Sequence, residues 1–95
     1  VRFRPCPLFF LEVYYTYIIQ SESTGKLYIG QTNNLQARVN RHNSNKNFTT
    51  KNKGPWTLLF FEEFETRSEA MLYENKIKSY KNSNFILNKI NRNEL

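Results

Sequence analysis

The feature that most constrains the fold is a pair of segments near the N-terminus whose residues are typical of β-strands. Residues 14–20 are almost all aromatic or β-branched, and residues 26–30 resume the same extended pattern. Residues 21–25 lie between them and are rich in Ser, Thr and Gly, which form turns. The sequence therefore predicts an antiparallel hairpin with a loop of more than two residues. Because side chains alternate along a strand, one face of the first run carries Tyr15, Tyr17 and Ile19.

A helix is predicted to follow this hairpin, starting at Leu35 and ending near residue 43. Thr32 and Asn33 are typical helix N-caps. Leu35 and Val39 have the i, i+4 spacing of one apolar helix face. The residues that follow are polar, include several lysines and show no hydrophobic periodicity, so a loop is expected there.

The second half of the chain predicts a third strand and one or two further helices. Residues 56–61 are almost all apolar, which predicts a strand that is central or covered on both faces. Thr66-Arg-Ser-Glu69 has the form of a capping box, which begins the clearest helix of the chain. The inner stripe of that helix is marked by Ala70, Tyr73, Ile77 and Tyr80. Residues 82–95 are expected to form a last helix or a packed tail.

The predicted order is β-β-α-β-α plus a C-terminal helix or tail. It indicates an α+β fold with a small three-stranded antiparallel sheet flanked by helices. Residues 14–95 are expected to form this one domain, and residues 1–13 an N-terminal extension outside the fold. The apolar run Leu8-Phe9-Phe10-Leu11 is too short for a signal sequence or a membrane span. Cys6 has no second cysteine to pair with, which favours a reducing compartment. We therefore expect a soluble, cytoplasmic protein with no membrane partner.

The charge balance indicates a polyanionic partner and excludes several classes of enzyme. The chain has 14 Lys and Arg against 8 acidic residues, which gives a net charge of +6. Nucleic acid is the commonest partner of such a surface. All the acidic residues are glutamates, which disfavours sites that hold two metal ions with clustered aspartates. One His and one Cys exclude a four-ligand structural zinc site and a Ser-His-Asp triad.

Glu74 falls inside the inner stripe of the second predicted helix, and two interpretations are open. A carboxylate on a core-facing stripe needs a partner or a metal ion. A surface Glu74 would instead pair with Lys78, one turn later. A single carboxylate is a sufficient anchor for Mg²⁺, which keeps several waters and takes further oxygens from a phosphate.

Four other residues are candidates for phosphate chemistry. Arg38 offers a permanent charge and a forked donor for phosphate oxygens. His42, one helical turn later, could donate to a phosphate or transfer a proton near neutral pH. Tyr17 and Tyr28 could act as bases if a nearby cation lowered their pKa. Taken singly, each also has an ordinary interpretation: a solvated arginine, a helix-edge histidine or a strand aromatic.

Taken together, these residues fall into four elements in a fixed order. They are the strand end Tyr28-Ile29-Gly30, the earlier Tyr15-Thr16-Tyr17, the run Asn34–Asn43 with Arg38 and His42, and the run Ser68–Lys78 with Glu74. This pattern resembles the GIY-YIG nuclease superfamily, in particular its small stand-alone members. The YIG element is intact, whereas the GIY element keeps only its last tyrosine. The resemblance spans residues 14–90.

The resemblance implies a divalent-metal-dependent endonuclease that hydrolyses phosphodiester bonds, most often in DNA. One Mg²⁺ or Mn²⁺ ion on Glu74 would hold the scissile phosphate, and Arg38 would neutralise the charge that develops on it. Tyr28 would activate the attacking water, with Tyr17 or His42 assisting. The alternative is a non-catalytic nucleic-acid-binding module that uses the same basic surface.

The resemblance also implies a set of residues that contact nucleic acid. Gln31 stands where some members of the superfamily have a lysine, so one cationic assistant is missing. The full set is Gly30, Gln31, Arg41, Lys46, Lys51, Lys53 and Asn88. Repair, recombination and defence against foreign DNA all remain open as contexts, as do a protein partner for targeting and the oligomeric state.

Overall fold

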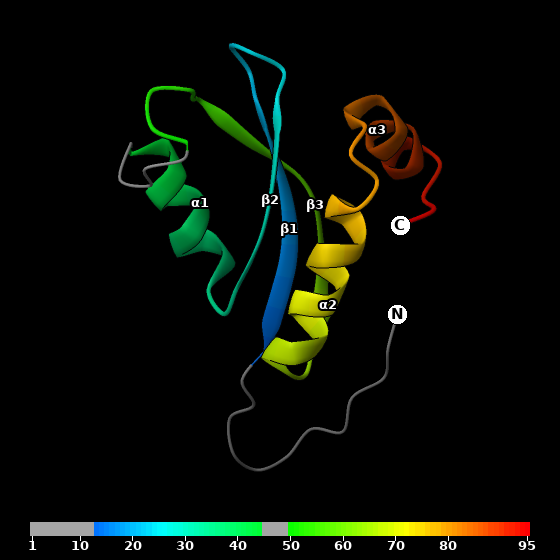
Figure 1. Cartoon of the computed structure of the whole chain (residues 1–95). Coiled ribbons are helices and arrows are strands. Elements are labelled where there is room, and N and C mark those ends of the chain that lie inside the picture. Colours follow the sequence, from blue (N-terminus) through cyan, green and yellow to red (C-terminus); the bar gives the residue numbers. More distant parts are fainter. Residues whose placement is uncertain (1–12, 45–49) are drawn as a thin grey trace.

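The computed structural model describes residues 13–44 and 50–95 of the chain, which form a three-stranded sheet and three helices. Strand β1 covers Tyr14–Ser21, β2 covers Leu27–Thr32 and β3 covers Trp56–Phe64. The strand order is β2-β1-β3, and both pairings are antiparallel. Figure 1 shows β1 in the middle of the sheet. The predicted α+β fold, with its hairpin and three-stranded antiparallel sheet, is confirmed.

Of the two alternatives predicted for β3, coverage on both faces is confirmed and a central position is wrong. Its apolar run predicted a strand that is central or covered on both faces, and β3 is an edge strand. Leu58 packs into the apolar cluster on one face of the sheet, and Phe60 packs into the cluster on the other. An edge strand can therefore have a nearly continuous apolar run when helices cover both faces of its sheet. Further along, Phe61 is 46% exposed.

Helix α1 covers Leu35–Asn43, α2 covers Arg67–Lys78 and α3 covers Ser83–Asn91. The start of α2 that the capping box predicted is confirmed, with Thr66 as the N-cap, because its side chain accepts a hydrogen bond from the backbone N–H of Glu69 at 3.2 Å. The predicted caps of α1 were wrong by one residue. Asn34 is the N-cap, and its side chain accepts from Ala37 N–H at 3.1 Å.

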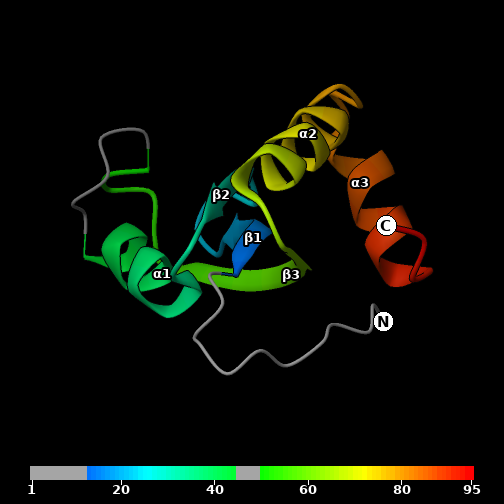
Figure 2. The same cartoon turned by 90° about the horizontal axis from the view of Figure 1, so that it is seen from below.

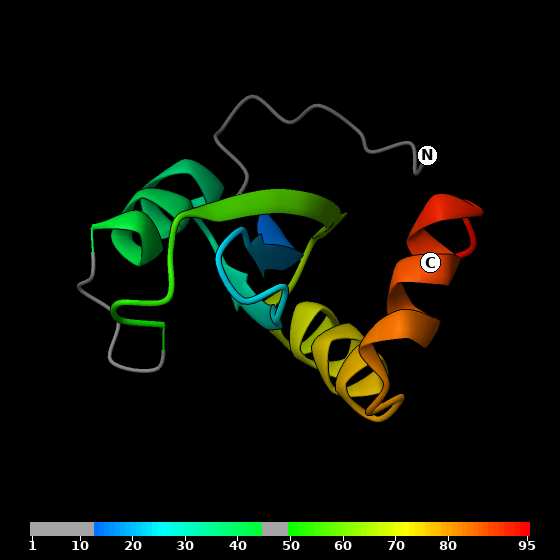
Figure 3. The ribbon, with the colours of Figure 1, turned by 90° about the horizontal axis from the view of Figure 1, so that it is seen from above.

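The three helices lie on two faces of the sheet. Figures 2 and 3 show α1 on one side of the strands, and α2 with α3 on the other. Tyr17 and Ile19 of β1 pack with Trp56 in the core under α1. The neighbouring Ile18 packs with Ile77 of α2 and with a buried isoleucine of α3 in the second core. The alternation predicted for β1 therefore separates two small apolar cores.

The C-terminal residues form a helix rather than an irregular tail. Asn82 caps α3 by accepting from Phe85 N–H at 3.1 Å. None of the helices in the described ranges is long and apolar enough to cross a membrane. The run Leu8-Phe9-Phe10-Leu11, Cys6 and the predicted boundary at residue 13 fall in or beside residues 1–12, which lie outside the described residues.

Candidate active site

Tyr17 reaches the rest of the candidate site by lying across Gly30. The two residues are cross-strand partners in the β1–β2 pairing. A Cβ atom at Gly30 would come within 2.6 Å of the Tyr17 hydroxyl oxygen and 2.8 Å of the ring carbon that bears it. Only glycine leaves room for the ring at this point of the strand. Gly30 is itself buried beneath the ring, so its first effect is to place Tyr17.

A buried hydrogen-bonded chain holds the Tyr17 hydroxyl in place. This hydroxyl lies 3.0 Å from His42 Nε2, and His42 Nδ1 lies 2.7 Å from the Thr50 hydroxyl. Tyr17 and His42 are 0% exposed and Thr50 is 1% exposed. The backbone carbonyl of Thr50 accepts from the Trp56 indole at 3.4 Å. Thr50 was not predicted as part of the site, since a single threonine in a polar loop carries no periodic signal.

The environment keeps Tyr17 and His42 uncharged near neutral pH. Burial raises the pKa of Tyr17 to about 12, and the nearby Tyr28 and Glu74 act in the same direction. The Arg38 guanidinium opposes this increase in the Tyr17 pKa by its charge and by hydrogen bonding. Burial lowers the pKa of His42 to about 4, with the positive charges of Arg38 and Arg41 as further causes.

These pKa values bear on which group could activate water. A phenol with a raised pKa holds its proton firmly, so Tyr17 acts as a hydrogen-bond donor rather than as a tyrosinate base. His42 is fully buried and does not face the solvent. Tyr28 is half-buried, and its ring centroid lies 4.8 Å from that of His42 and 6.4 Å from that of Tyr17. Tyr28 is therefore the one member of this aromatic trio with access to water.

Glu74 fits both of the interpretations that the sequence left open. Its side chain is 15% exposed, and it pairs with Lys78 at 2.6 Å in the expected i, i+4 arrangement. Its charge also acts on the Tyr17 hydroxyl. The Glu74 charge therefore acts on the site even though α2 covers the opposite face of the sheet from α1.

The charges of Arg38 and Glu74 both act on Tyr17, although the two residues belong to different helices. Arg38 belongs to α1 and Glu74 to α2, and both helices flank the β-hairpin. Both charges act on one phenol oxygen, which lies over Gly30 of β2. A cation and a carboxylate on either side of one hydroxyl form a suitable frame for a phosphate with a bound cation.

The metal-ligand chemistry of the described residues is sparse. Within residues 13–44 and 50–95, no three His, Cys, Asp or Glu side chains lie close enough together to hold a metal ion. Glu74 alone fits an ion such as Mg²⁺, which takes one or two carboxylates and otherwise keeps water and phosphate oxygens as ligands.

The residues predicted to contact nucleic acid are more widely spread. Gln31 accepts a hydrogen bond from Arg67 at 2.9 Å. Arg41, Lys51 and Lys53 are exposed near the C-terminal end of α1 and in the loop after it. Asn88 is exposed on α3, which Figures 1 and 2 show on the side of the molecule away from α1. Lys46 lies outside the described residues.

Comparisons with known proteins show the family of this chain. The family model of the GIY-YIG catalytic domain matches residues 13–91. A UPF0213 protein of Haloquadratum walsbyi is 39% identical over 70 residues, which cover 73% of this chain and 78% of that protein. A UPF0213 protein of Staphylococcus haemolyticus is 38% identical over 68 residues, or 70% of this chain and 82% of that protein.

A solved structure shows the same fold. The solution NMR structure of the UPF0213 protein BH0048 from Bacillus halodurans superposes with a TM-score of 0.50 at 28% sequence identity. The superposition covers 86% of this chain and 90% of that one. The relatives are therefore small proteins of about the same length.

Proposed function

Because the chain belongs to the GIY-YIG catalytic domain family, a nuclease family, we propose that it is a divalent-metal-dependent endonuclease that hydrolyses phosphodiester bonds in DNA. What supports this most is that the charges of Arg38 and Glu74, which belong to helices on opposite faces of the sheet, both act on the pKa of Tyr17. A protein that only binds nucleic acid has no need of a carboxylate at this position.

Each residue of the site has a separate role in this proposal. Arg38 binds the scissile phosphate and neutralises the charge that develops on it. Tyr28, which has access to solvent, orients and activates the attacking water. Glu74 would hold one Mg²⁺ or Mn²⁺ ion, which when bound supplies Lewis-acid stabilisation of the leaving oxygen. Tyr17 and His42 are positioning residues, because they are buried and act through their hydrogen bonds.

A second candidate function is a nucleic-acid-binding module without turnover. The observation that favours it is the Lys78–Glu74 ion pair at 2.6 Å, which already neutralises the carboxylate. In that case Glu74 would not repel a phosphate held by Arg38.

A nicking assay separates the two functions. We expect the wild-type protein to nick supercoiled plasmid or branched DNA with Mg²⁺ or Mn²⁺, and EDTA to abolish the reaction. Arg38→Ala and Glu74→Gln should each lower the rate by about 10²- to 10³-fold. Glu69→Gln, in the exposed first turn of the same helix, is the matched control and should keep the wild-type rate. If concentrated wild-type protein binds these substrates but cuts none of them, the binding module is correct.

A further inference from the structure

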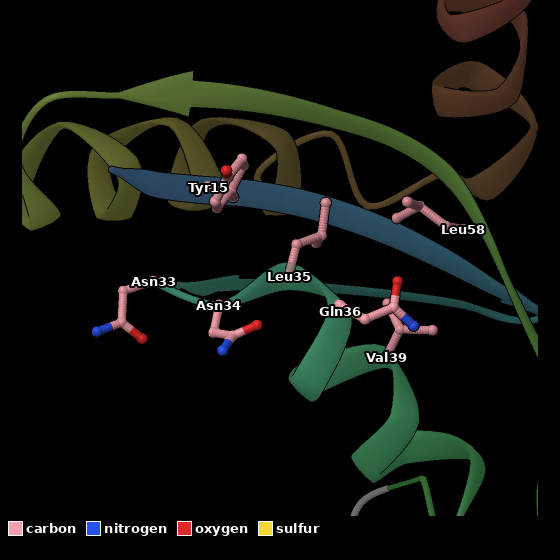
Figure 4. A pocket seen from close by; sticks show the side chains of 7 residues that line it. All are labelled: Tyr15, Asn33, Asn34, Leu35, Gln36, Val39 and Leu58. Carbon is pink, nitrogen blue, oxygen red and sulfur yellow. The ribbon is translucent and has the colours of Figure 1, made fainter. Parts of the chain in front are cut away.

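A second concave site lies beside the flank of α1 that carries Leu35 and Val39. It has a volume of about 490 Å³ and lies between the start of α1, β1 and β3. Leu35 and Val39 of α1 line this site, and Arg38 lies about 60° from Leu35 and about 100° from Val39 around the helix. The two sites therefore lie on neighbouring flanks of the same helix. Figure 4 shows the side chains that line the second site.

The lining of this site is uncharged, although the chain has a net charge of +6. Leu35, Val39 and Leu58 form an apolar floor. Tyr15 forms one wall, and its ring packs edge to face against Phe61 at a centroid distance of 5.9 Å. An apolar floor beside an aromatic ring suits a flat, neutral ring better than a free phosphate.

Three carboxamide side chains complete the lining and offer both donors and acceptors. The Asn34 oxygen accepts from Ala37 N–H, so its NH₂ group remains available. The Gln36 NH₂ group donates to Asn40 at 3.2 Å, which leaves the Gln36 oxygen as an acceptor. The Asn33 carboxamide has no partner among the described residues. Mixed donors and acceptors of this kind match the edges of nucleobases.

The same end of α1 can accommodate a phosphate. The helix begins at Leu35, beside the pocket, and its first turn contains no acidic residue. The first backbone N–H groups of a helix have no partner within the helix and attract anions. A base in the pocket would therefore have its phosphate near a favourable partner.

We propose that this site, the base pocket, binds one unpaired nucleobase of the nucleic-acid substrate. The proposal rests on the proposed function and specifies its substrate class. Bases in an intact duplex are stacked and paired, so only a single-stranded or extruded nucleotide can enter. The strand would pass around the start of α1 between the base pocket and Arg38. The preferred substrate is therefore DNA with an unpaired nucleotide close to the bond that is cut.

A titration followed by NMR tests the pocket without any cleavage. Thymidine 5′-monophosphate is compared with deoxyribose 5-phosphate, which has the sugar and phosphate but no base. We expect the nucleotide to shift the side-chain NH₂ signals of Asn33, Asn34 and Gln36, and the sugar phosphate to leave them unchanged. Equal shifts with both compounds, or shifts confined to other residues, would overturn the proposal.

Variants test the same pocket with longer ligands. Tyr15→Ala should weaken binding of a labelled single-stranded oligothymidylate by about tenfold and leave binding of a blunt duplex unchanged. Gln36→Ala removes an exposed side chain, so it tests the pocket without disturbing the core. Phe85→Ala, a 46% exposed aromatic on α3, is the control. An equal loss for single strand and duplex would overturn the base pocket.

The two proposals fail separately. Metal-dependent nicking without base-dependent shifts would remove the base pocket and leave the endonuclease. Base-dependent shifts in a protein that never cuts would remove the endonuclease and keep the pocket.

Discussion

The Tyr17 hydroxyl contacts His42 only because Gly30 has no side chain. Gly30→Ala would place a Cβ atom 2.6 Å from that hydroxyl and force the ring away from its 3.0 Å hydrogen bond. We expect a loss of about 1–3 kcal/mol in the free energy of unfolding, the usual cost of overpacking. We also expect a larger loss of nicking than this instability explains.

Urea denaturation and the nicking assay measure both effects of Gly30→Ala. Tyr17→Phe is the matched comparison, since it removes the hydrogen bond and keeps the ring. If Gly30→Ala unfolded at the wild-type urea concentration, the close approach of ring and strand would be wrong.

His42 is the only histidine, so its protonation can be followed without ambiguity. Burial raises the pKa of Tyr17, so its hydroxyl keeps its proton, and we expect it to donate this proton to His42 Nε2 at 3.0 Å. The proton on His42 then lies on Nδ1 and is donated to Thr50. We expect ¹⁵N NMR at neutral pH to show this Nδ1–H tautomer, and the Nε2–H tautomer would contradict it.

The lowered pKa of His42 also predicts how stability depends on pH. The unfolded chain binds a proton near pH 6.5, whereas the folded protein resists protonation until about pH 4. The stabilisation from neutral His42 is thus fully present above about pH 6.5 and decreases as the pH falls toward 4. Urea denaturation at several pH values measures this decrease. In His42→Gln the decrease over this pH range should be smaller, and an unchanged slope would assign it to other groups.

Helix α2 has a side-chain N-cap whose contribution can be measured. The Thr66 side chain accepts from Glu69 N–H at 3.2 Å. Thr66→Ala should therefore lower the free energy of unfolding by about 1 kcal/mol. Ser68→Ala lies in the same exposed turn and caps nothing, so we expect it to be nearly neutral in thermal unfolding. Equal effects of the two substitutions would show that the cap does not contribute.

The sequence predicted those elements whose signals are local. The capping box located the start of α2, and the alternation of Tyr15, Tyr17 and Ile19 assigned the faces of β1 correctly. The position of β3 depends on which strands pair across the sheet, and an apolar run does not encode that. Asn34 replaced the predicted caps of α1 because three consecutive residues, Thr32 to Asn34, are all good caps.

The candidate site was predictable as a set of residues but not as a set of contacts. Tyr17, Tyr28, Arg38, His42 and Glu74 were all named from the sequence. The structure places Tyr17, Tyr28 and His42 next to one another, and the charges of Arg38 and Glu74 act on the pKa of Tyr17. The part played by Thr50 was missed, because it depends on a hydrogen bond to His42, which has no signal in the local sequence. The raised pKa of Tyr17 was missed as well, since it follows from burial in the assembled core.

The whole molecule has its helices on both faces of a narrow sheet. In a wider sheet, side chains from opposite faces would be separated by further strands. Here β2 is both an edge strand and the partner of the central strand, so charges from α1 and α2 act on one hydroxyl at this edge. The small size of the domain is thus part of how the candidate site is assembled.

The distribution of positive charge predicts how binding responds to salt. Thr50 is anchored to His42, and the carbonyl oxygen of Lys53 accepts from the Ser21 hydroxyl at 2.5 Å. These contacts fix the backbone that carries the exposed Lys51 and Lys53 beside α1. If both lysines bind phosphates, Lys51→Ala with Lys53→Ala should lower the slope of log affinity against log salt by about 2 for duplex DNA.

The control for this salt dependence removes the same charge from the other side of the molecule. Lys76 and Arg92 are exposed near the ends of α2 and α3, away from α1. Replacing both by alanine changes the net charge equally, so long-range attraction falls equally, while no phosphate contact of the loop is lost. Fluorescence anisotropy from low to moderate salt gives the two slopes. A direct phosphate contact releases a counterion, whereas a distant charge does not. Equal slopes of log affinity against log salt in the two double variants would therefore mean that the loop lysines act through net charge alone.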